Sequence, residues 1–209
     1  KSRVLHTVGI GESVVDSEIS DLLSLESPRI GLLAHSGVVD IKITATAADE
    51  AQTDELIGRV EGIARERLGE AIFGADEESL EVVVLNQLEA LGHTIAVVES
   101  GTRGQLAEKL AIADAGRGVF RAGVLHSQWE VTGKLDLHLE KIVMGCINTY
   151  GTDLCVASVV VKGETGNDLG VALLPAETGD VLIETRCHGG HVDSAGEWSA
   201  NLGLNLART

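Results

Sequence analysis

The sequence predicts an α+β protein in two parts, a ferredoxin-like domain followed by an α/β sandwich built around a mixed sheet. Three observations predict this class. Strand-like and helix-like segments follow the split βαβ order, β-α-β-β-α-β, over residues 1–74. A polar cluster at residues 74–78 then interrupts the chain, and beyond it apolar strands alternate with amphipathic helices. We therefore expect two domains, residues 1–75 and 76–209.

The first domain combines four strand-like stretches with two helices. Its strands are expected at residues 3–8, 30–34, 38–46 and 71–73. Ser13 and Asp16 are predicted to cap the first helix, directly after a glycine-rich turn. Asp49 and Gln52 form a box-like start for the long second helix, and Gly69 is expected to end it.

The second domain alternates as expected for a sheet covered by helices. Its strands are expected at residues 93–98, 118–125, 154–161, 169–174 and 180–185. Its helices are expected at residues 79–91, 106–113, 135–149 and 192–206. The last helix carries one apolar stripe at helical spacing, formed by Ala195, Trp198, Leu202 and Leu206.

The charge of the chain limits its partners. The net charge is −16 and no basic cluster is present, whereas a nucleic-acid surface needs clustered lysines and arginines. RNA-binding KH domains also need a basic Gly-x-x-Gly loop, and Gly-Ile-Gly-Glu at residues 9–12 is not one. We therefore expect no nucleic-acid partner and interpret the first domain as a scaffold.

No apolar run is long enough to span a membrane and no signal peptide is visible, so no membrane partner is expected. The three cysteines, Cys146, Cys155 and Cys187, are odd in number and scattered along the chain. That pattern favours a reducing cytoplasm over a disulfide framework. We expect a cytoplasmic protein.

The best candidate site is the short loop between the strand at 93–98 and the next helix. It consists of Ser100, Gly101, Thr102, Arg103 and Gly104. Its glycines allow close backbone approach, and a helix N-terminus beside an arginine favours a bound anion. Ser100 would be a nucleophile if a lysine or histidine stood beside it. The alternative is an ordinary strand-to-helix turn with Thr102 as the cap.

Two other segments carry side chains that could act together with Ser100 or bind a metal. His126 and Ser127 follow the strand at 118–125, so they could lie at the same sheet edge as Ser100, and Lys134 follows them. A Ser–Lys or Ser–His pair is one interpretation, and an exposed loop is the other. The stretch from Cys187 to His191 holds soft ligands in a row, but zinc needs a fourth ligand and usually a wider spread. We interpret it as a polar loop and expect no metal and no cofactor.

Two stretches make the chain resemble the CinA family of competence- and damage-inducible proteins. The first is TVGIGES at residues 7–13, with IGLLA at 30–34 and DIKIT at 40–44. It is similar to the family's KH-like middle domain. The second is HTIAVVESGTRGQLA at residues 93–107, which is similar to the E-S-C-T-G-G segment of the family's C-terminal domain. Because full-length members carry a molybdopterin-binding-like domain before this region, we expect residue 1 to lie inside a longer protein.

The resemblance implies that the second domain is related to nicotinamide mononucleotide deamidases, which hydrolyse the carboxamide of the nucleotide to the acid and ammonia. It implies a catalytic serine at Ser100, a catalytic lysine and a bound 5′-phosphate, with homo-oligomeric, dimeric assembly. The sequence departs from the family pattern at several positions. Gly101 and Arg103 replace Cys and Gly, His126 stands where Tyr is expected, and the lysine of Tyr-Ser-x-x-x-Lys is missing, with Lys134 further on. The loop at 162–167 lacks its proline, and residues 189–191 lack the arginine of G-D-R.

These departures leave two interpretations open. In one, the chain is a degenerate member that binds a pyridine nucleotide or a phosphate and is weakly active or inactive. In the other, it is an amidohydrolase in which Ser100 attacks the carboxamide, Lys134 or His126 takes the proton, and the N–H groups of residues 101–104 hold the oxyanion or the phosphate.

Overall fold

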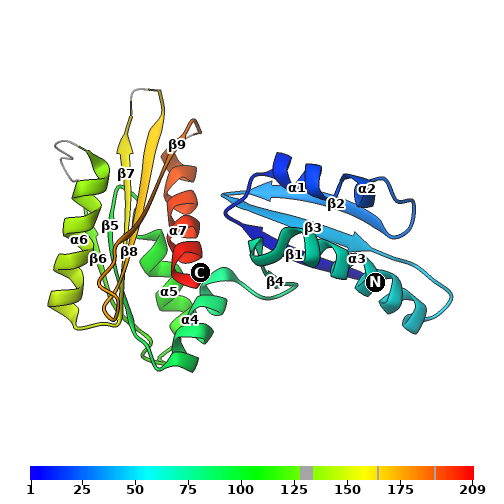
Figure 1. Ribbon diagram of the computed structural model, residues 1–209, viewed down its shortest axis with the longest axis horizontal. Helices are drawn as coiled ribbons and strands as arrows, with labels where there is room; N and C mark the ends of the chain where they lie inside the picture. The colour runs from blue at the N-terminus through cyan, green and yellow to red at the C-terminus, as the bar shows by residue number, and fades with distance from the viewer. Residues whose placement is uncertain (128–133, 164, 191) are drawn as a thin grey trace. The chain divides into compact units, whose positions relative to one another are not determined.

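The computed structural model describes residues 1–127, 134–163, 165–190 and 192–209. The chain divides into two compact units, Lys1–Ser79 and Leu80–Thr209, which are described separately below (Figure 1). Across the described ranges, no helix is both long enough and apolar enough to pass through a bilayer.

The first unit is a four-stranded antiparallel sheet with helices on one face. Its strands are β1 (Ser2–Val8), β2 (Arg29–His35), β3 (Val38–Thr44) and β4 (Ile72–Ala75), in the order β2-β3-β1-β4. Its helices are α1 (Glu12–Glu18), α2 (Ser20–Leu23), α3 (Glu50–Leu68) and the short 3-10 turn η1 (Gly69–Ala71). The core forms because alternate strand residues, such as Leu5 and Ile41, pack against Ile19 and Val60 of the helical layer. The predicted ferredoxin-like class is confirmed.

Two predictions about helix ends in this unit are borne out and one is wrong. The Asp49 side chain accepts a hydrogen bond from the Gln52 N–H at 2.8 Å, and Gly69 ends α3 with φ +53°. Ser13 does not cap the first helix, because α1 begins at Glu12 after Gly11 and has no side-chain cap. The helical segment also breaks at residue 19 into α1 and α2, so the single expected helix is two.

The second unit is a five-stranded mixed sheet in the order β6-β5-β7-β8-β9. The strands are β5 (Ile95–Ser100), β6 (Phe120–His126), β7 (Leu154–Lys162), β8 (Asn167–Pro175) and β9 (Leu182–His188). β5, β6 and β7 are parallel, and β8 and β9 are each antiparallel to the strand before. The last strand extends past the predicted residues 180–185 to residue 188, because it stays paired with β8 as far as Asn167.

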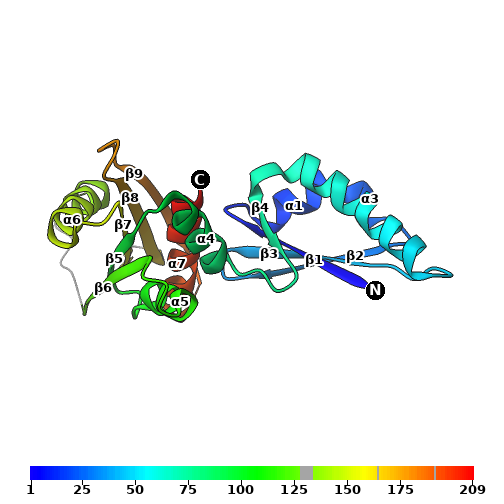
Figure 2. The same ribbon diagram turned by 90° about the horizontal axis from the view of Figure 1, so that it is seen from below.

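Helices cover both faces of this sheet (Figure 2). α6 (Leu135–Tyr150) lies on one face, where Leu139 and Val143 pack on Ala96, Val98 and the neighbouring strands. α5 (Gln105–Asp114) and α7 (Val192–Arg208) lie on the other face, with α4 (Leu80–Leu91) packed against them. The predicted α/β sandwich around a mixed sheet is confirmed.

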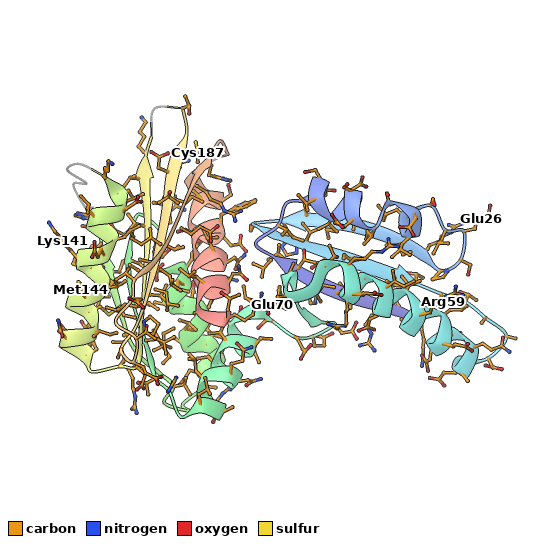
Figure 3. The ribbon with its side chains drawn as sticks, in the orientation of Figure 1. Glu26, Arg59, Glu70, Lys141, Met144 and Cys187 are labelled. Atoms are coloured by element: carbon orange, nitrogen blue, oxygen red, sulfur yellow. A yellow bond between two sulfur atoms is a disulfide. The ribbon has the colours of Figure 1, made fainter. Side chains whose placement is uncertain are left out.

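A disulfide joins Cys146 of α6 to Cys155 of β7, so the expectation that the cysteines form no disulfide is wrong for this pair. The chain turns at Gly151 directly after α6 and returns as β7, which packs against that helix. This brings the two cysteines to a Cα–Cα distance of 6.3 Å, within the range that a disulfide bridges. Cys187 is a free thiol on the exposed strand β9 (Figure 3).

Candidate functional site

The carboxyl ends of β5 and β6 lie where the winding of the sheet changes direction. β5 leads into α5 on one face, whereas the chain after β6 continues to α6 on the opposite face (Figure 2). Adjacent parallel strands whose connections leave to opposite faces create a crevice outside their carboxyl ends, and α/β proteins bind ligands there. Ser100 is the last residue of β5, His126 is the last of β6, and the two are paired in register. The fold therefore brings these two predicted site residues together.

Ser100 and His126 also share one face of the sheet. Val98 and Val124, two residues earlier in each strand, both pack in the cluster beneath α6, and side chains two apart in a strand point the same way. A cavity of about 270 Å³ opens on this face, where His126 lines it together with Lys141 and Tyr150 of α6. A ligand in this cavity would contact the histidine directly.

The Ser100 side chain has no hydrogen-bonded base beside it in the described part of the chain. The residue is 2% exposed, and its hydroxyl makes no hydrogen bond to another residue in the described part of the chain. A serine becomes a strong nucleophile when an adjacent base hydrogen-bonds to it. The described residues provide no such hydrogen bond, although His126 is the register neighbour.

Lys134 lies directly before α6, as its N-cap residue, and its side chain is exposed. In the described ranges it makes no hydrogen bond to Ser100. The residues between Ser127 and Lys134 lie outside the described part of the chain, including those at which the family pattern expects its lysine. The Ser–Lys pair, one of the interpretations that the sequence left open, is therefore not formed among the described residues.

The N-terminus of α5 is occupied by a carboxylate of the protein itself. Glu99 is fully buried, and its carboxylate accepts hydrogen bonds from the Thr102 hydroxyl at 2.6 Å, the Leu106 N–H at 3.1 Å and the Ala107 N–H at 2.7 Å. Free N–H groups and the helix dipole make such a helix end favourable for an anion, and here Glu99 is that anion. An external phosphate or oxyanion cannot use these two amides.

Sequence reasoning missed Glu99, although one feature points to it. β5 alternates its side chains between the two faces, so Glu99 must point to the face opposite Ser100, where α5 begins. A charged residue in a fully buried strand needs partners, and the nearest free donors are the first amides of that helix.

The turn at residues 101–104 is held in a conformation that few side chains tolerate. Gly101, Arg103 and Gly104 all have positive φ, at +71°, +63° and +80°. A Cβ atom on Gly101 would lie 2.1 Å from the Val160 carbonyl oxygen of β7, so only glycine fits there. Arg103 adopts the left-handed conformation at a position where the family pattern has Gly, and its side chain is exposed.

Thr102 is neither the exposed ligand nor the helix cap that the sequence allowed. Gly104 is the N-cap residue of α5 and no side chain caps it. Thr102 is fully buried, its hydroxyl donates to Glu99, and the Gly104 N–H reaches that hydroxyl only at 3.4 Å. The interpretation of Thr102 as the cap is therefore wrong, because Glu99 bonds the helix amides instead.

The loops that follow β7 and β9 meet at the same sheet edge. The Asn167 side chain, at the start of β8, donates to the Gly190 carbonyl at 3.2 Å, which ties the end of the first loop to the second. His188 pairs with the Ser194 hydroxyl at 3.0 Å and packs against the Trp198 ring, with centroids 5.5 Å apart. His191 lies outside the described ranges, and within them no group of three or more His, Cys, Asp or Glu side chains could hold a metal ion.

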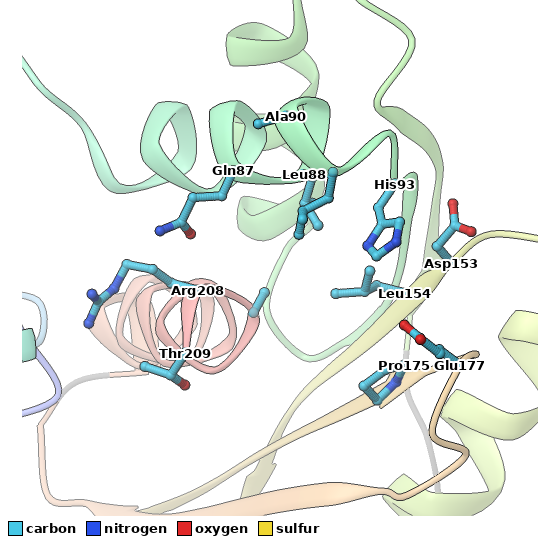
Figure 4. A pocket seen from close by; sticks show the side chains of 12 residues that line it. Gln87, Leu88, Ala90, His93, Asp153, Leu154, Pro175, Glu177, Arg208 and Thr209 are labelled. Atoms are coloured by element: carbon cyan, nitrogen blue, oxygen red, sulfur yellow. The ribbon is translucent and has the colours of Figure 1, made fainter.

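A larger cavity lies at the opposite edge of the sheet, where β5 and β7 begin. It has a volume of about 550 Å³ (Figure 4). Leu88 and Leu154 provide apolar walls, His93 and Asp153 stand on one side, and Arg208 stands on the other (Figure 4). Asp153 accepts hydrogen bonds from the Thr94 hydroxyl and N–H, which lower the pKa of its carboxyl. This carboxylate, which precedes β7, is therefore held in place by the residue that precedes the neighbouring strand β5.

Comparisons with known proteins indicate the family to which the chain belongs. Residues 2–74 match the profile described as "Damage-inducible protein CinA KH domain". A "CinA-like protein" from Frankia casuarinae is 40% identical over 133 residues, which cover 62% of this chain and 31% of that protein. A "CinA-like protein" from Thermomicrobium roseum is 31% identical over 191 residues, covering 89% of this chain and 47% of that protein. The chain thus spans less than half the length of these curated relatives.

A solved structure shares the fold. The crystal structure of a competence-damaged protein (CinA) superfamily protein from Escherichia coli matches with a TM-score of 0.53 and 14% identity. The match covers 68% of this chain and 97% of that chain. The domain profile, the curated relatives and the shared fold agree, and the chain belongs to the CinA family.

Proposed function

We propose that the second unit of this chain is a degenerate CinA-type deamidase domain that binds a pyridine mononucleotide at the carboxyl ends of β5 and β6 and turns it over weakly or not at all. The observation that carries this proposal is that no base is hydrogen-bonded to Ser100 in the described structure. Its hydroxyl is buried without a hydrogen-bonded base in the described structure, and the exposed Lys134 does not reach it. A missing base lowers a rate by about 10² to 10⁴.

The amides that could stabilise a developing negative charge are those of the turn. Glu99 already takes the N–H groups of Leu106 and Ala107, so an oxyanion has only the amides of the turn itself. Glu99 matches the Glu of the E-S-C-T-G-G segment, so the case for weak turnover depends on the unassisted Ser100 and not on Glu99.

Binding is supported by Arg103. Its guanidinium is permanently charged and exposed on the turn beside the crevice. A guanidinium forms paired hydrogen bonds to a phosphate, so the 5′-phosphate of a nucleotide would be recognised here rather than at the end of α5.

The register of Ser100 and His126 supports a second candidate, an active nicotinamide mononucleotide amidohydrolase. In that reaction the Ser100 oxygen attacks the carboxamide carbon while His126 takes the hydroxyl proton. The C–N bond then breaks, and His126 gives the proton to the departing ammonia. Water hydrolyses the acyl-serine to the carboxylic acid and regenerates Ser100.

One set of measurements separates these functions. The 209-residue chain and its Ser100→Ala, His126→Ala and Arg103→Gly variants are incubated with nicotinamide mononucleotide, and ammonia release and thermal stability are recorded. Arg103→Gly is the matched binding variant, because glycine suits the φ of +63° and the change removes the guanidinium.

The proposal predicts that the nucleotide raises the midpoint of unfolding of the chain and of Ser100→Ala but not of Arg103→Gly. It also predicts ammonia release near background that Ser100→Ala leaves unchanged. Turnover abolished by both Ser100→Ala and His126→Ala would establish the amidohydrolase instead. Neither turnover nor a shift in any protein would refute both.

A further inference from the structure

β9 is an open edge of the sheet in the second unit. In the described part of the chain this strand pairs with β8 alone, and all of its residues except Glu184 and His188 are exposed. Two of the exposed residues are large and apolar, Leu182 at 48% and Ile183 at 37%. An edge strand has unpaired backbone N–H and C=O groups along one side, which form hydrogen bonds with any strand that docks there.

The sequence of β9 is complementary to itself. Glu184 and Arg186 lie on one face of the strand and form an ion pair, with the Arg186 Nε–H donating to Glu184 at 2.7 Å. If two copies of β9 pair antiparallel with Thr185 opposite Thr185, Glu184 of each copy stands opposite Arg186 of the other. Opposite charges directly across an antiparallel pair stabilise it. The four side chains then form a square in which every neighbour has the opposite sign.

The same charges select this register. Centring the pair on Glu184 would place two carboxylates opposite each other, and centring it on Arg186 would oppose two guanidinium groups, both of which are unfavourable. A shift of one residue also moves every side chain to the other face of the sheet. The charged residues therefore favour one arrangement and disfavour its nearest alternatives.

The other edge strands lack this property. β6, at the far edge of the same sheet, carries Arg121 and His126 but no acidic residue. β2, at one edge of the sheet in the first unit, has Arg29 and His35, which stand opposite each other when the strand is paired with itself about its centre. β4, at the other edge of that sheet, has no charged residue. Self-pairing at those strands gains no ion pair.

We infer that β9 pairs antiparallel with β9 of a second copy of this chain, centred on Thr185, so that two sheets join into one across a two-fold axis. A cavity of about 270 Å³ beside this edge is lined by Asp136 and Asp168 together with Thr185 and Cys187. In the pair, Ile183 of the second copy stands opposite Cys187 and forms a further wall of that cavity. The inference does not depend on the proposed function, because neither Ser100 nor Arg103 takes part.

A charge-exchange experiment tests the pairing. The 209-residue chain, the single variants Glu184→Arg and Arg186→Glu, and the double variant with both changes are compared by sedimentation equilibrium over a range of concentrations. Each single variant places like charges opposite each other twice, so the dissociation constant of the dimer is expected to rise at least ~10-fold. The double variant restores both pairs and is expected to dimerise like the parent chain.

Cross-linking tests the register with a thiol that the chain already has. Directly opposed Cα atoms in an antiparallel pair lie about 4.5–5.5 Å apart, which a disulfide can bridge. Ile183→Cys would stand opposite Cys187 of the second copy, so oxidised glutathione is expected to link the two chains covalently. Leu182→Cys is the matched control, because it stands opposite His188 on the other face and is expected not to link.

Each outcome decides the inference. A monomer at all concentrations would overturn it, as would a dimer that both single charge variants leave intact. A cross-link that forms equally with Leu182→Cys would refute the Thr185-centred register. Weakened single variants, a rescued double variant and a cross-link specific to Ile183→Cys would establish it.

Discussion

Thr102 and Glu99 face each other across the candidate turn, and the Thr102 hydroxyl donates a 2.6 Å hydrogen bond to the buried Glu99 carboxylate. The same carboxylate accepts the N–H groups of Leu106 and Ala107 at the start of α5. The turn therefore closes around an internal negative charge. This arrangement joins β5 to α5 and holds Ser100 at the strand end, but it removes the helix terminus from the set of groups that could bind a ligand.

Glu99→Ala is expected to lower the free energy of unfolding of the second unit by about 3 kcal/mol or more, because it leaves three donors without this acceptor, two of them buried. Glu99→Gln keeps the shape and one acceptor oxygen, so its cost is expected to be about 1–2 kcal/mol. The measurement is urea unfolding followed by tryptophan fluorescence, since both tryptophans, Trp129 and Trp198, belong to this unit. Glu108→Gln, exposed on the same helix, is the control and should stay within about 0.5 kcal/mol of the parent. Equal effects of Glu99→Gln and Glu108→Gln would contradict the bonding role.

Gly101→Ala and Gly104→Ala separate conformational strain from a steric clash within one turn. Both glycines have positive φ, so each alanine is expected to lower the free energy of unfolding by about 1–2 kcal/mol, because the left-handed conformation is unfavourable for alanine. Only at Gly101 does the new Cβ also meet a backbone atom, the Val160 oxygen at 2.1 Å, whereas at Gly104 the nearest neighbour is Leu125 at 3.7 Å. We expect Gly101→Ala to cost at least ~3 kcal/mol in the same urea experiment and Gly104→Ala about half as much. Similar values for the two would refute the close approach to β7.

The disulfide between Cys146 and Cys155 predicts that the stability of the second unit depends on redox conditions. A bridge with a sequence separation of 9 closes a short loop, for which the loss of chain entropy in the unfolded state corresponds to about 2–3 kcal/mol. Dithiothreitol is therefore expected to lower the urea midpoint of the parent chain. The double variant Cys146→Ala and Cys155→Ala serves as the control and should not respond to the reductant. A parent chain that is equally insensitive would show that the bond does not form in solution.

His6 makes the stability of the first unit depend on pH. Burial lowers the pKa of this imidazole, but hydrogen bonds to the Asp40 carboxylate at 2.6 Å and to the Asp76 carbonyl at 2.9 Å outweigh burial and raise it above its usual value. A raised pKa in the folded state stabilises the fold fully below about pH 6.5, and this contribution is lost as the pH rises through the folded value.

Hydrogen exchange of the β1 and β3 amides measures this effect for the first unit. Asp40→Asn removes the charged acceptor and is expected to reduce the difference in protection between pH 5.5 and pH 8.5. His35 also bonds to Asp40, at 3.1 Å, so His35→Gln is needed to assign the response to His6. A protection difference that persists in Asp40→Asn but vanishes in His35→Gln would contradict the assignment.

Much of the fold could be predicted from local pattern. Asp49 and Gly69 mark the two ends of α3 as expected, because capping and the left-handed helix end depend on residues that are adjacent in sequence. The break at Ile19 and the absence of a cap at Ser13 could not be predicted in the same way. Ile19 is fully buried in the core of the first unit, so packing against residues distant in sequence takes precedence there over the local helical pattern.

At the candidate site, too, some features follow from the local sequence and others only from the tertiary structure. The chain alone determined the alternation of strands and helices, the location of the turn after β5 and the residue types in it, because each depends on a few neighbouring side chains. Only the tertiary structure decided that His126 stands beside Ser100, that Lys134 does not bond to it, and that Cys146 reaches Cys155. It also decided that Glu99 fills the end of α5. These relationships depend on strand order and on which face each strand presents, and such long-range pairings leave no trace in local periodicity.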